Sequence, residues 1–236
     1  MGLEFPTKDT EPAPLPMKKL TDLWAHLHAP GTDICVPRYL LKSAGYHLRG
    51  KRITAHHNTE IRGLQNIAIA KGGSLSIGKV SMGFMHGGDR TFLNIEGELR
   101  IQGGVYLGKG CRLHVAPGGR IELDTCYFTG LSRAIISHEL KIGRETVIAW
   151  GCEFLDRDWH TISYPGKKEK PEGLGIHIGE RCWIGSDVKI LKGVRLGDGS
   201  VVAANTVLTG SYPGGSLIAG NPGRVIRSGV TWSATE

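Results

Sequence analysis

The sequence predicts an all-β protein built as a solenoid, in which one chain winds into stacked coils of short strands. Three observations predict this class. Aliphatic residues recur every six positions, which fits neither the period of an α-helix nor the alternation of a simple hairpin. Glycine contributes 35 of the 236 residues, roughly twice its usual share, as tight turns between short strands require. Hydrophobic residues make up 40% of the chain and recur regularly, which excludes a disordered glycine-rich chain.

The N-terminal part lacks this period, and we assign residues 1–52 to a flexible arm and a short helical segment. Residues 1–16 are rich in proline and charge. Residues 37–48 predict a helix, and the solenoid follows over residues 53–227, with a tail at residues 228–236. A further amphipathic helix is predicted over residues 18–28 from the helical spacing of Leu20, Leu23, Trp24 and Leu27.

The six-residue period is clearest from Ile142 onward, where a small residue usually follows each aliphatic one. Three such hexads make one triangular coil of about 18 residues, and each coil bonds to the next at the ~4.8 Å strand spacing. An earlier, weaker set lies between Ile77 and Leu113. Between Leu113 and Ile136 the phase slips, and the sequence assigns no coil there. The inward positions of the clear set are Ile142, Ile148, Phe154, Ile178, Ile184, Ile190, Leu196, Val202 and Leu208.

Charge and cysteine content restrict the partners and the compartment. The net charge is +7, but the cations are scattered and no recognition helix or RNA-binding signature accompanies them, so no nucleic-acid partner is expected. Local cations suit the phosphates of a cofactor or sugar nucleotide equally well. Five cysteines without a CxxC pair predict reduced thiols and a cytoplasmic protein. Neither a membrane-spanning segment nor an apolar signal core is present, so neither stable membrane insertion nor secretion is expected.

The hexads resemble the left-handed parallel β-helix of the hexapeptide-repeat acyltransferases. The resemblance covers residues 53–227 and is strongest over residues 142–227. Within that family the chain is similar to sugar and surface-polysaccharide O-acetyltransferases, including the galactoside and maltose acetyltransferase type. The resemblance implies the left hand of the coil, a homotrimer, and acetyl-CoA bound between neighbouring subunits, with no metal required.

A polar insertion interrupts the hexads, and its base carries the candidate catalytic residues. The loop over residues 163–175 breaks the period with prolines and lysines, and such insertions often carry function. His160 stands just before it and matches the family's catalytic histidine. A histidine can take the proton of a sugar hydroxyl as that hydroxyl attacks a thioester, and a nearby carboxylate fixes its tautomer. Asp158 is the expected partner, with Asp156 and Glu153 as alternatives, and Asp156 and Trp159 are expected to contact the acceptor.

The predicted cofactor site lies in the C-terminal coils. Trp183, Gly185 and Ser186 form a segment that resembles the family's WIG segment, where the tryptophan lines the tunnel beside the thioester. Ala203 and Ala204 occupy positions where the family keeps small residues against the pantetheine arm. The chain then has a GNPG segment where the family has GNPA, and by resemblance its arginines reach the cofactor phosphates. The residues of this ending are Asn221, Pro222, Arg224 and Arg227.

The leading function is therefore acetyl transfer from acetyl-CoA to a carbohydrate hydroxyl of a polysaccharide, oligosaccharide or precursor. The nearest alternative is N-acetylation of an amino sugar, free or nucleotide-linked, which the same base and cofactor site would serve. A zinc carbonic anhydrase of this fold is disfavoured, because no two histidines are five residues apart, as that family's zinc ligands require. A non-catalytic scaffold would not need Asp158, His160, Trp183 and the terminal arginines together.

Overall fold

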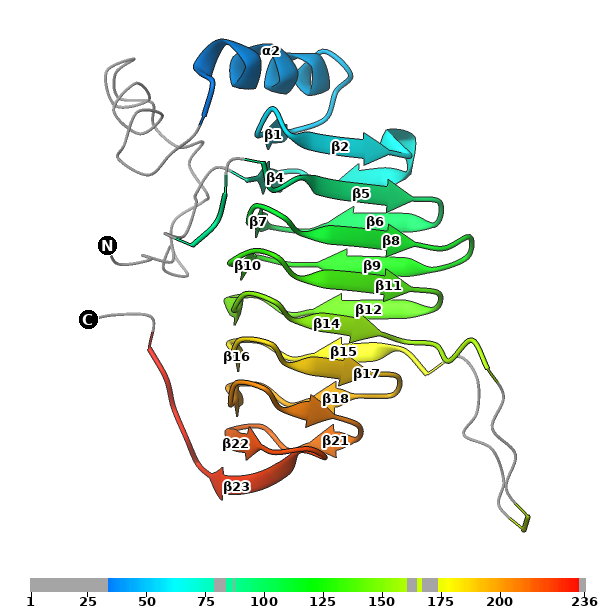
Figure 1. The fold of residues 1–236 in the computed structure, drawn as a ribbon, viewed down its shortest axis with the longest axis vertical. Helices are drawn as coiled ribbons and strands as arrows, with labels where there is room; N and C mark the ends of the chain where they lie inside the picture. Colours follow the sequence, from blue (N-terminus) through cyan, green and yellow to red (C-terminus); the bar gives the residue numbers. More distant parts are fainter. Residues whose placement is uncertain (1–33, 79–83, 87, 161–164, 167–173, 234–236) are drawn as a thin grey trace.

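A computed structural model describes residues 34–78, 84–86, 88–160, 165–166 and 174–233. The predicted helix over residues 18–28 and most of the predicted loop over residues 163–175 lie outside these residues. In the described part the chain coils through three parallel sheets, which form the sides of a triangular prism (Figure 1). The predicted all-β solenoid is confirmed.

Each sheet takes one strand from each coil, so strands three apart in order are neighbours. We name the sheets A, B and C in the order in which the chain visits them. Sheet A contains β1 Ile53–Ala55, β4 Ser74–Ile77, β7 Gly104–Leu107, β10 Cys126–Phe128, β13 Thr146–Ile148, β16 Trp183–Ile184, β19 Val201–Val202 and β22 Ser216–Ala219. Sheet B contains β2 Thr59–Arg62, β5 Thr91–Ile95, β8 Arg112–Val115, β11 Arg133–Ile136, β14 Glu153–Leu155, β17 Lys189–Leu191 and β20 Val207–Leu208. Sheet C contains β3 Ile67–Ile69, β6 Glu98–Ile101, β9 Arg120–Leu123, β12 Glu139–Ile142, β15 Ile176–Ile178, β18 Arg195–Leu196 and β21 Ser211–Tyr212. A short 3-10 turn, η1 Leu64–Asn66, leads from sheet B to sheet C in the first coil.

The predicted hexads form the core of the C-terminal coils. All nine predicted inward positions from Ile142 to Leu208 are buried. Ile148 pairs with Ile184 and Ile184 with Val202, so these side chains stack in a column inside sheet A. Burial of such columns is the main stabilising term of the solenoid, because apolar surface leaves water along the whole stack.

The N-terminal coils are wider than the sequence predicts, and this corrects the uniform 18-residue coil. Leu113 pairs with Ala134 and Ala134 with Phe154, so these coils have a longer repeat than the hexad coils, in which Ile178 pairs with Leu196. Their strands have up to four or five residues, with two or three inward side chains in alternation. The slip of the six-residue phase after Leu113 therefore reflects wider faces of the prism, and β8 to β11 occupy this stretch in regular order.

A helix closes the N-terminal end of the prism (Figure 1). Helix α2 spans Val36–His47, as the sequence predicts for residues 37–48, and has proline in its first turn. Its buried side chains are Tyr39, Ser43 and Tyr46, which share one face. The backbone N–H of Ala55 donates to Ser43 Oγ at 3.2 Å. The helix thus covers the first coil, as a solenoid end requires.

The C-terminal end is closed by a reversed strand. Strand β23, Arg224–Ser228, pairs antiparallel with β22, and the chain beyond it returns along sheet A (Figure 1). The Trp232 ring lies 6.1 Å from the Trp183 ring, and Trp232 Nε1 donates to the carbonyl oxygen of Arg181 at 2.7 Å. The tail therefore contacts one of the predicted cofactor residues.

Candidate functional site

The predicted cofactor residues converge on one corner of the prism, between sheets A and B. Gly185 N–H donates to Val202 O at 2.8 Å, and Asn205 N–H donates to Ser186 O at 2.9 Å. A Cβ on Gly185 would lie 2.7 Å from the backbone nitrogen of Ala204, so glycine is needed where the two coils approach. The corner is therefore a ledge of backbone and small side chains.

The predicted GNPG segment continues this ledge at the C-terminal end. Val207 N–H donates to Gly220 O at 3.0 Å, and Gly223 N–H donates to Val207 O at 2.8 Å. Asn221, Pro222, Arg224 and Arg227 are exposed. Arg224 donates to the carbonyl oxygen of Gly223 at 3.0 Å.

The Trp183 ring stands at the sheet A side of the ledge. Its side chain is on the outer face of β16 and is 45% exposed, although the Trp232 ring contacts it. Its register neighbours along sheet A are Val147 and Val201. The ring thus belongs to a mostly apolar outer column that also includes Tyr106, Tyr127 and Leu217.

The predicted catalytic residues lie at a different corner, where the chain leaves β14 of sheet B. His160 is exposed, and among the described residues it forms no hydrogen bond with Asp158. Asp158 Oδ2 instead pairs with Lys192 Nζ at 2.6 Å. Trp159, between them, is also exposed. Within one chain, the width of sheet B therefore separates these residues from the cofactor ledge. The expected Asp158–His160 dyad is not formed in this structure.

Asp156 does not lie where it could contact an acceptor, which corrects our expectation for this residue. Its side chain is only 1% exposed. Its carboxylate accepts three consecutive backbone N–H groups, from Ser137 at 2.7 Å to Oδ1, and from His138 and Glu139 at 2.7 and 2.9 Å to Oδ2. Both oxygens are therefore used to anchor the base of the insertion to the previous coil. An acceptor sugar cannot reach them without breaking these bonds.

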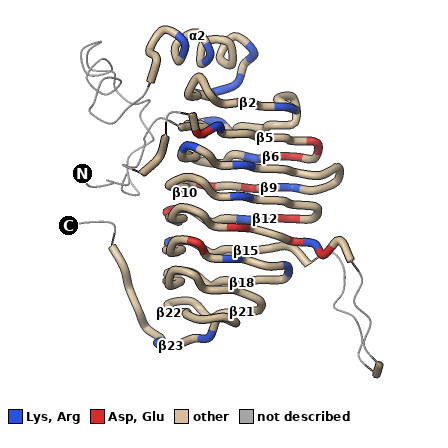
Figure 2. The backbone as a smooth tube through the Cα atoms, viewed as in Figure 1, with Lys and Arg blue, Asp and Glu red and all other residues tan. Residues whose placement is uncertain are grey.

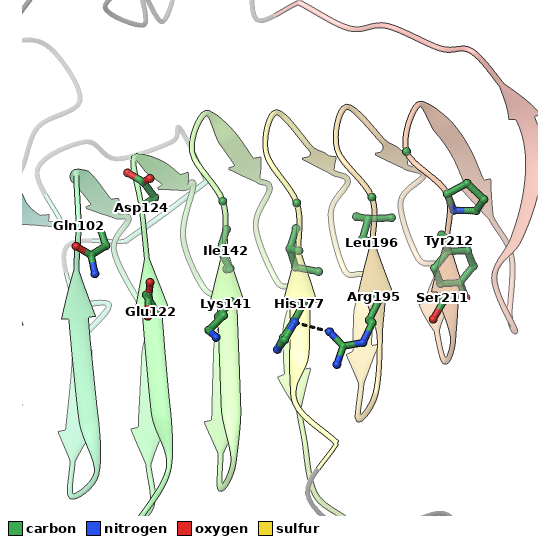
Figure 3. Close-up of a pocket in the computed structure, with 16 residues that line it drawn as sticks. Gln102, Glu122, Asp124, Lys141, Ile142, His177, Arg195, Leu196, Ser211 and Tyr212 are labelled. Atoms are coloured by element: carbon green, nitrogen blue, oxygen red, sulfur yellow. Dashed lines mark hydrogen bonds between the residues drawn. The ribbon is translucent and has the colours of Figure 1, made fainter. Parts of the chain in front are cut away.

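Sheet C carries a histidine–carboxylate pair that the sequence analysis did not single out. His177 Nε2 lies 2.7 Å from Glu139 Oε2, and the Arg195 guanidinium donates to His177 Nδ1 (Figure 3). Partial burial raises the pKa of Glu139, but hydrogen bonds from Lys141 and His177 outweigh it, so the net pKa is lowered. The sequence contains one signal for this network: His177 and Arg195 are one hexad coil apart.

His177 and Arg195 of this network line an open groove of about 730 Å³ along sheet C (Figure 3). Both charge signs face the groove, with Glu122 and Asp124 beside Lys141 and Arg195. Because both ring nitrogens of His177 are engaged, that imidazole is not free to accept a proton from a substrate. The arrangement favours a structural role, in which charged side chains of neighbouring coils pair along sheet C, over a role as catalytic base.

Exposed apolar side chains extend the A–B corner toward the N-terminal end. The Phe84 and Trp150 rings meet edge to face at 5.2 Å, and Leu131, which is also exposed, has a left-handed φ of 54°. A Cβ on Gly130 would lie 2.2 Å from Met85 Cε, so residues 84–86 pack directly on this corner. Asp187 N–H donates to Trp150 O at 3.0 Å, which places this cluster one coil from Ser186.

The cysteines supply no nucleophile to either corner. All five are free, and Cys111, Cys126, Cys152 and Cys182 are buried. Burial raises the pKa of Cys152 to about 12 and of Cys182 to about 11. No group of three or more His, Cys, Asp or Glu in the described ranges is arranged to hold a metal ion. No helix in that part of the chain is long and apolar enough to cross a membrane.

Comparison with known proteins assigns the family. Residues 175–210 match the model of bacterial transferase hexapeptide repeats. An uncharacterized 24.8 kDa protein from a cps region of Klebsiella pneumoniae is 34% identical over 184 residues, which cover 77% of this chain and 82% of that protein. The chain belongs to the bacterial hexapeptide-repeat transferases. These are acyltransferases, and a left-handed parallel β-helix is the fold of this family.

One more relative and one solved structure are also similar to this chain. An Escherichia coli K12 protein, provisionally named lipopolysaccharide biosynthesis O-acetyl transferase WbbJ, is 34% identical over 95 residues. That match covers 36% of this chain and 48% of the relative, so the chain spans about half of its length. The Bacillus cereus N-acyltransferase AntD, solved with a dTDP-linked amino sugar and coenzyme A, superposes with a TM-score of 0.47 at 13% identity, covering 79% of this chain and 88% of that one.

Proposed function

We propose that this hexapeptide-repeat transferase moves an acetyl group from acetyl-CoA to a hydroxyl of a carbohydrate. The observation that carries the proposal is the continuous A–B corner. It runs from exposed arginines at β23, over the small-residue ledge at Gly185 and Ala204, to the Phe84–Trp150 cluster. Successive coils along it are about 4.8 Å apart. A long cofactor with phosphates at one end and a thioester at the other matches this order of chemistry.

Each part of the corner has a role toward such a cofactor. Arg224 and Arg227 would bind its phosphates, since a guanidinium donates in pairs to phosphate oxygens. Asn221 and Pro222 would flank the nucleotide end, and Ser186, Ala203 and Ala204 would accommodate the pantetheine arm. The exposed Trp183 ring would cover the arm near the thioester. A sugar ring, which has one apolar C–H face, would then pack on Trp150.

The proposed reaction needs one base and one set of oxyanion donors. His160 accepts the proton of the sugar hydroxyl while the oxygen attacks the thioester carbonyl carbon. Backbone N–H groups at a coil turn stabilise the tetrahedral oxyanion. The carbon–sulfur bond then breaks, and the leaving thiolate takes the proton from the imidazolium. Asp158 can orient His160 only after its ion pair with Lys192 breaks. Substrate binding would therefore exchange Lys192 for His160 as the partner of Asp158.

We propose that the site is completed by a neighbouring subunit in a homotrimer. His160 and the cofactor ledge lie at different corners of one chain, so acyl transfer requires the corner of a second copy. The apolar outer column of sheet A, from Tyr106 to Leu217, is the surface that such a copy would cover. Exposed apolar columns of this kind are typical of interfaces.

Co-assembly of two inactive variants tests whether neighbouring subunits share the site. His160→Ala removes the base, and Ala204→Tyr blocks the pantetheine arm. Random co-assembly of equal amounts in a cyclic trimer gives about a quarter of sites with both features intact. Recovery of activity near that level supports a shared site. No recovery from mixed trimers, each variant being folded, places base and cofactor in one chain.

The function itself is tested by release of free CoA thiol from acetyl-CoA against a panel of sugars and amino sugars. We expect thiol release with at least one sugar and a product heavier by one acetyl group. An ester-linked product supports O-acetylation, and an amide-linked product on an amino sugar favours the N-acetyl alternative. Absence of acetyl-CoA binding in calorimetry would overturn the proposed function.

A further inference from the structure

The outer face of α2 presents an apolar stripe that the fold does not use. The inner face, with Tyr39 and Tyr46, packs on the first coil. On the opposite face, Leu41 is 77% exposed and Leu48, at the C-terminal cap, is 88% exposed. Pro37 and Ala44 complete the stripe and are exposed as well. At 1.5 Å per residue the stripe is about 17 Å long.

Basic side chains predominate around this stripe, although the groove beside Arg49 also contains the Glu60 carboxylate. The sequence from Ile34 to Thr59 contains five lysines and arginines and no aspartate or glutamate. Figure 2 shows the resulting concentration of basic residues on α2 and the segment that follows it. Arg38, Arg49 and Arg52 are exposed. Arg38 and Arg49 lie along one flank of the leucine stripe, by their helical positions.

Two lysines of this segment bond to backbone carbonyl oxygens, so the exposed arginines are the cations that a ligand would meet. Lys42 Nζ donates to His57 O at 3.1 Å, and Lys51 Nζ donates to Ile67 O. Both ammonium groups therefore tie the helix and its following turn to the first coils. Partial burial lowers the pKa of Lys42, as expected for a cation held against the coil.

We propose that α2 is an interfacial helix that binds the surface of an anionic lipid bilayer. The leucine stripe would enter the boundary between headgroups and acyl chains, and the flanking arginines would contact lipid phosphates. An exposed apolar stripe with basic flanks is the chemistry that binds such surfaces. This binding is peripheral and reversible, and it does not depend on the proposed acetyl transfer.

The charge pattern favours lipid over the other occupants of this face. A second copy docked through the same stripe would bring two sets of arginines together, and like charges repel. A cyclic trimer would instead place three copies of α2 at one level along its axis, where all of them can meet one flat surface. Simultaneous binding of three helices to one bilayer surface raises the overall affinity without any new contact within the protein.

Vesicle sedimentation with the full chain tests the proposal. We expect binding to vesicles of phosphatidylcholine with about 30% phosphatidylglycerol, and weak binding to phosphatidylcholine alone. Leu41→Glu/Leu48→Glu should weaken binding at least about tenfold, and Arg38→Gln/Arg49→Gln should weaken it by a similar factor. Val225→Glu/Ile226→Glu, which changes exposed apolar residues at the opposite end, is the matched control and should bind like the wild type.

A labelled variant separates lipid from the alternative occupants. Leu41→Cys in a Cys35→Ser background carries a polarity-sensitive dye, because the remaining thiols are buried. A blue shift of the dye only on addition of anionic vesicles supports the proposal. A blue shift without vesicles would overturn it. In that case a dependence on protein concentration would indicate a second copy, and its absence would indicate coverage by residues 1–33. Vesicle binding that is absent, or that both glutamates leave unchanged, would also overturn it.

Discussion

Replacing Asp156 with asparagine should destabilise the protein strongly without altering its surface. The carboxylate is buried and accepts three backbone N–H groups at 2.7 to 2.9 Å. Asparagine keeps the shape and one acceptor oxygen, but its NH₂ group faces a backbone donor. Because a hydrogen bond to a charged group contributes about 1.5–3 kcal/mol, we expect Asp156→Asn to lower the free energy of unfolding by about 2–3 kcal/mol. Asp156→Ala, which leaves all three donors without this acceptor, should lower it by about 3–5 kcal/mol, because each unsatisfied buried donor costs about 1–3 kcal/mol.

The assay is chemical denaturation followed by circular dichroism at one fixed protein concentration. Asp158→Asn is the matched control, because its carboxylate is 55% exposed and pairs with one lysine. Exposed ion pairs contribute at most about 1 kcal/mol, so this control should stay within that range. If Asp156→Asn were as stable as the control, Asp156 would not be the anchor of the insertion, and a direct contact with the acceptor would return as its role.

Three further predictions follow from the described contacts. Ala204→Tyr should raise the KM for acetyl-CoA at least about tenfold, with a melting temperature close to that of the wild type, because this exposed side chain lies on the proposed pantetheine ledge; an unchanged KM would remove the ledge from the cofactor path. Glu139 stabilises the fold fully above its ordinary pKa of 4.5, and this contribution is lost as the pH falls through its lowered folded-state pKa. Urea unfolding from pH 6 to about 3 should therefore show a steeper loss of stability for the wild type than for Glu139→Gln; parallel curves would contradict it. A thiol reagent added to the native protein should modify one cysteine rapidly, the exposed Cys35, and the four buried thiols only on unfolding; two fast thiols would show that a coil opens readily.

Much of the solenoid could be predicted because the same types of residue recur at the same position of each six-residue repeat. The aliphatic positions from Ile142 to Leu208 are inward in every coil, and each position repeats the same physical requirement. The wider N-terminal coils could not be placed, since strands with two or three inward side chains change the repeat length from coil to coil. Leu113 and Ala134 are partners in adjacent coils although their side chains differ greatly in size.

The site was predictable where backbone geometry dictates residue type. Gly185 and Ala204 are small because two coils approach there, and the sequence retains that signature. The role of Asp156 was not predictable, since its three donors come from a turn some twenty residues earlier in the chain. Glu139 and His177 are also brought together across the insertion, whose length hides their register. The Phe84–Trp150 contact joins two segments of different coils, and no spacing in the sequence indicates it.

Acetyl-CoA turnover by two histidine variants tests whether His160 is the catalytic base. We expect His160→Ala to lower kcat by roughly 10²–10⁴-fold, as expected for loss of a general base. The native His177 ring is held between Glu139 and Arg195, so His177→Ala should retain turnover within about threefold if both variants are folded. The opposite pattern, with turnover lost in His177→Ala and kept in His160→Ala, would show that His160 is not the base and would move the catalytic centre to the groove on sheet C.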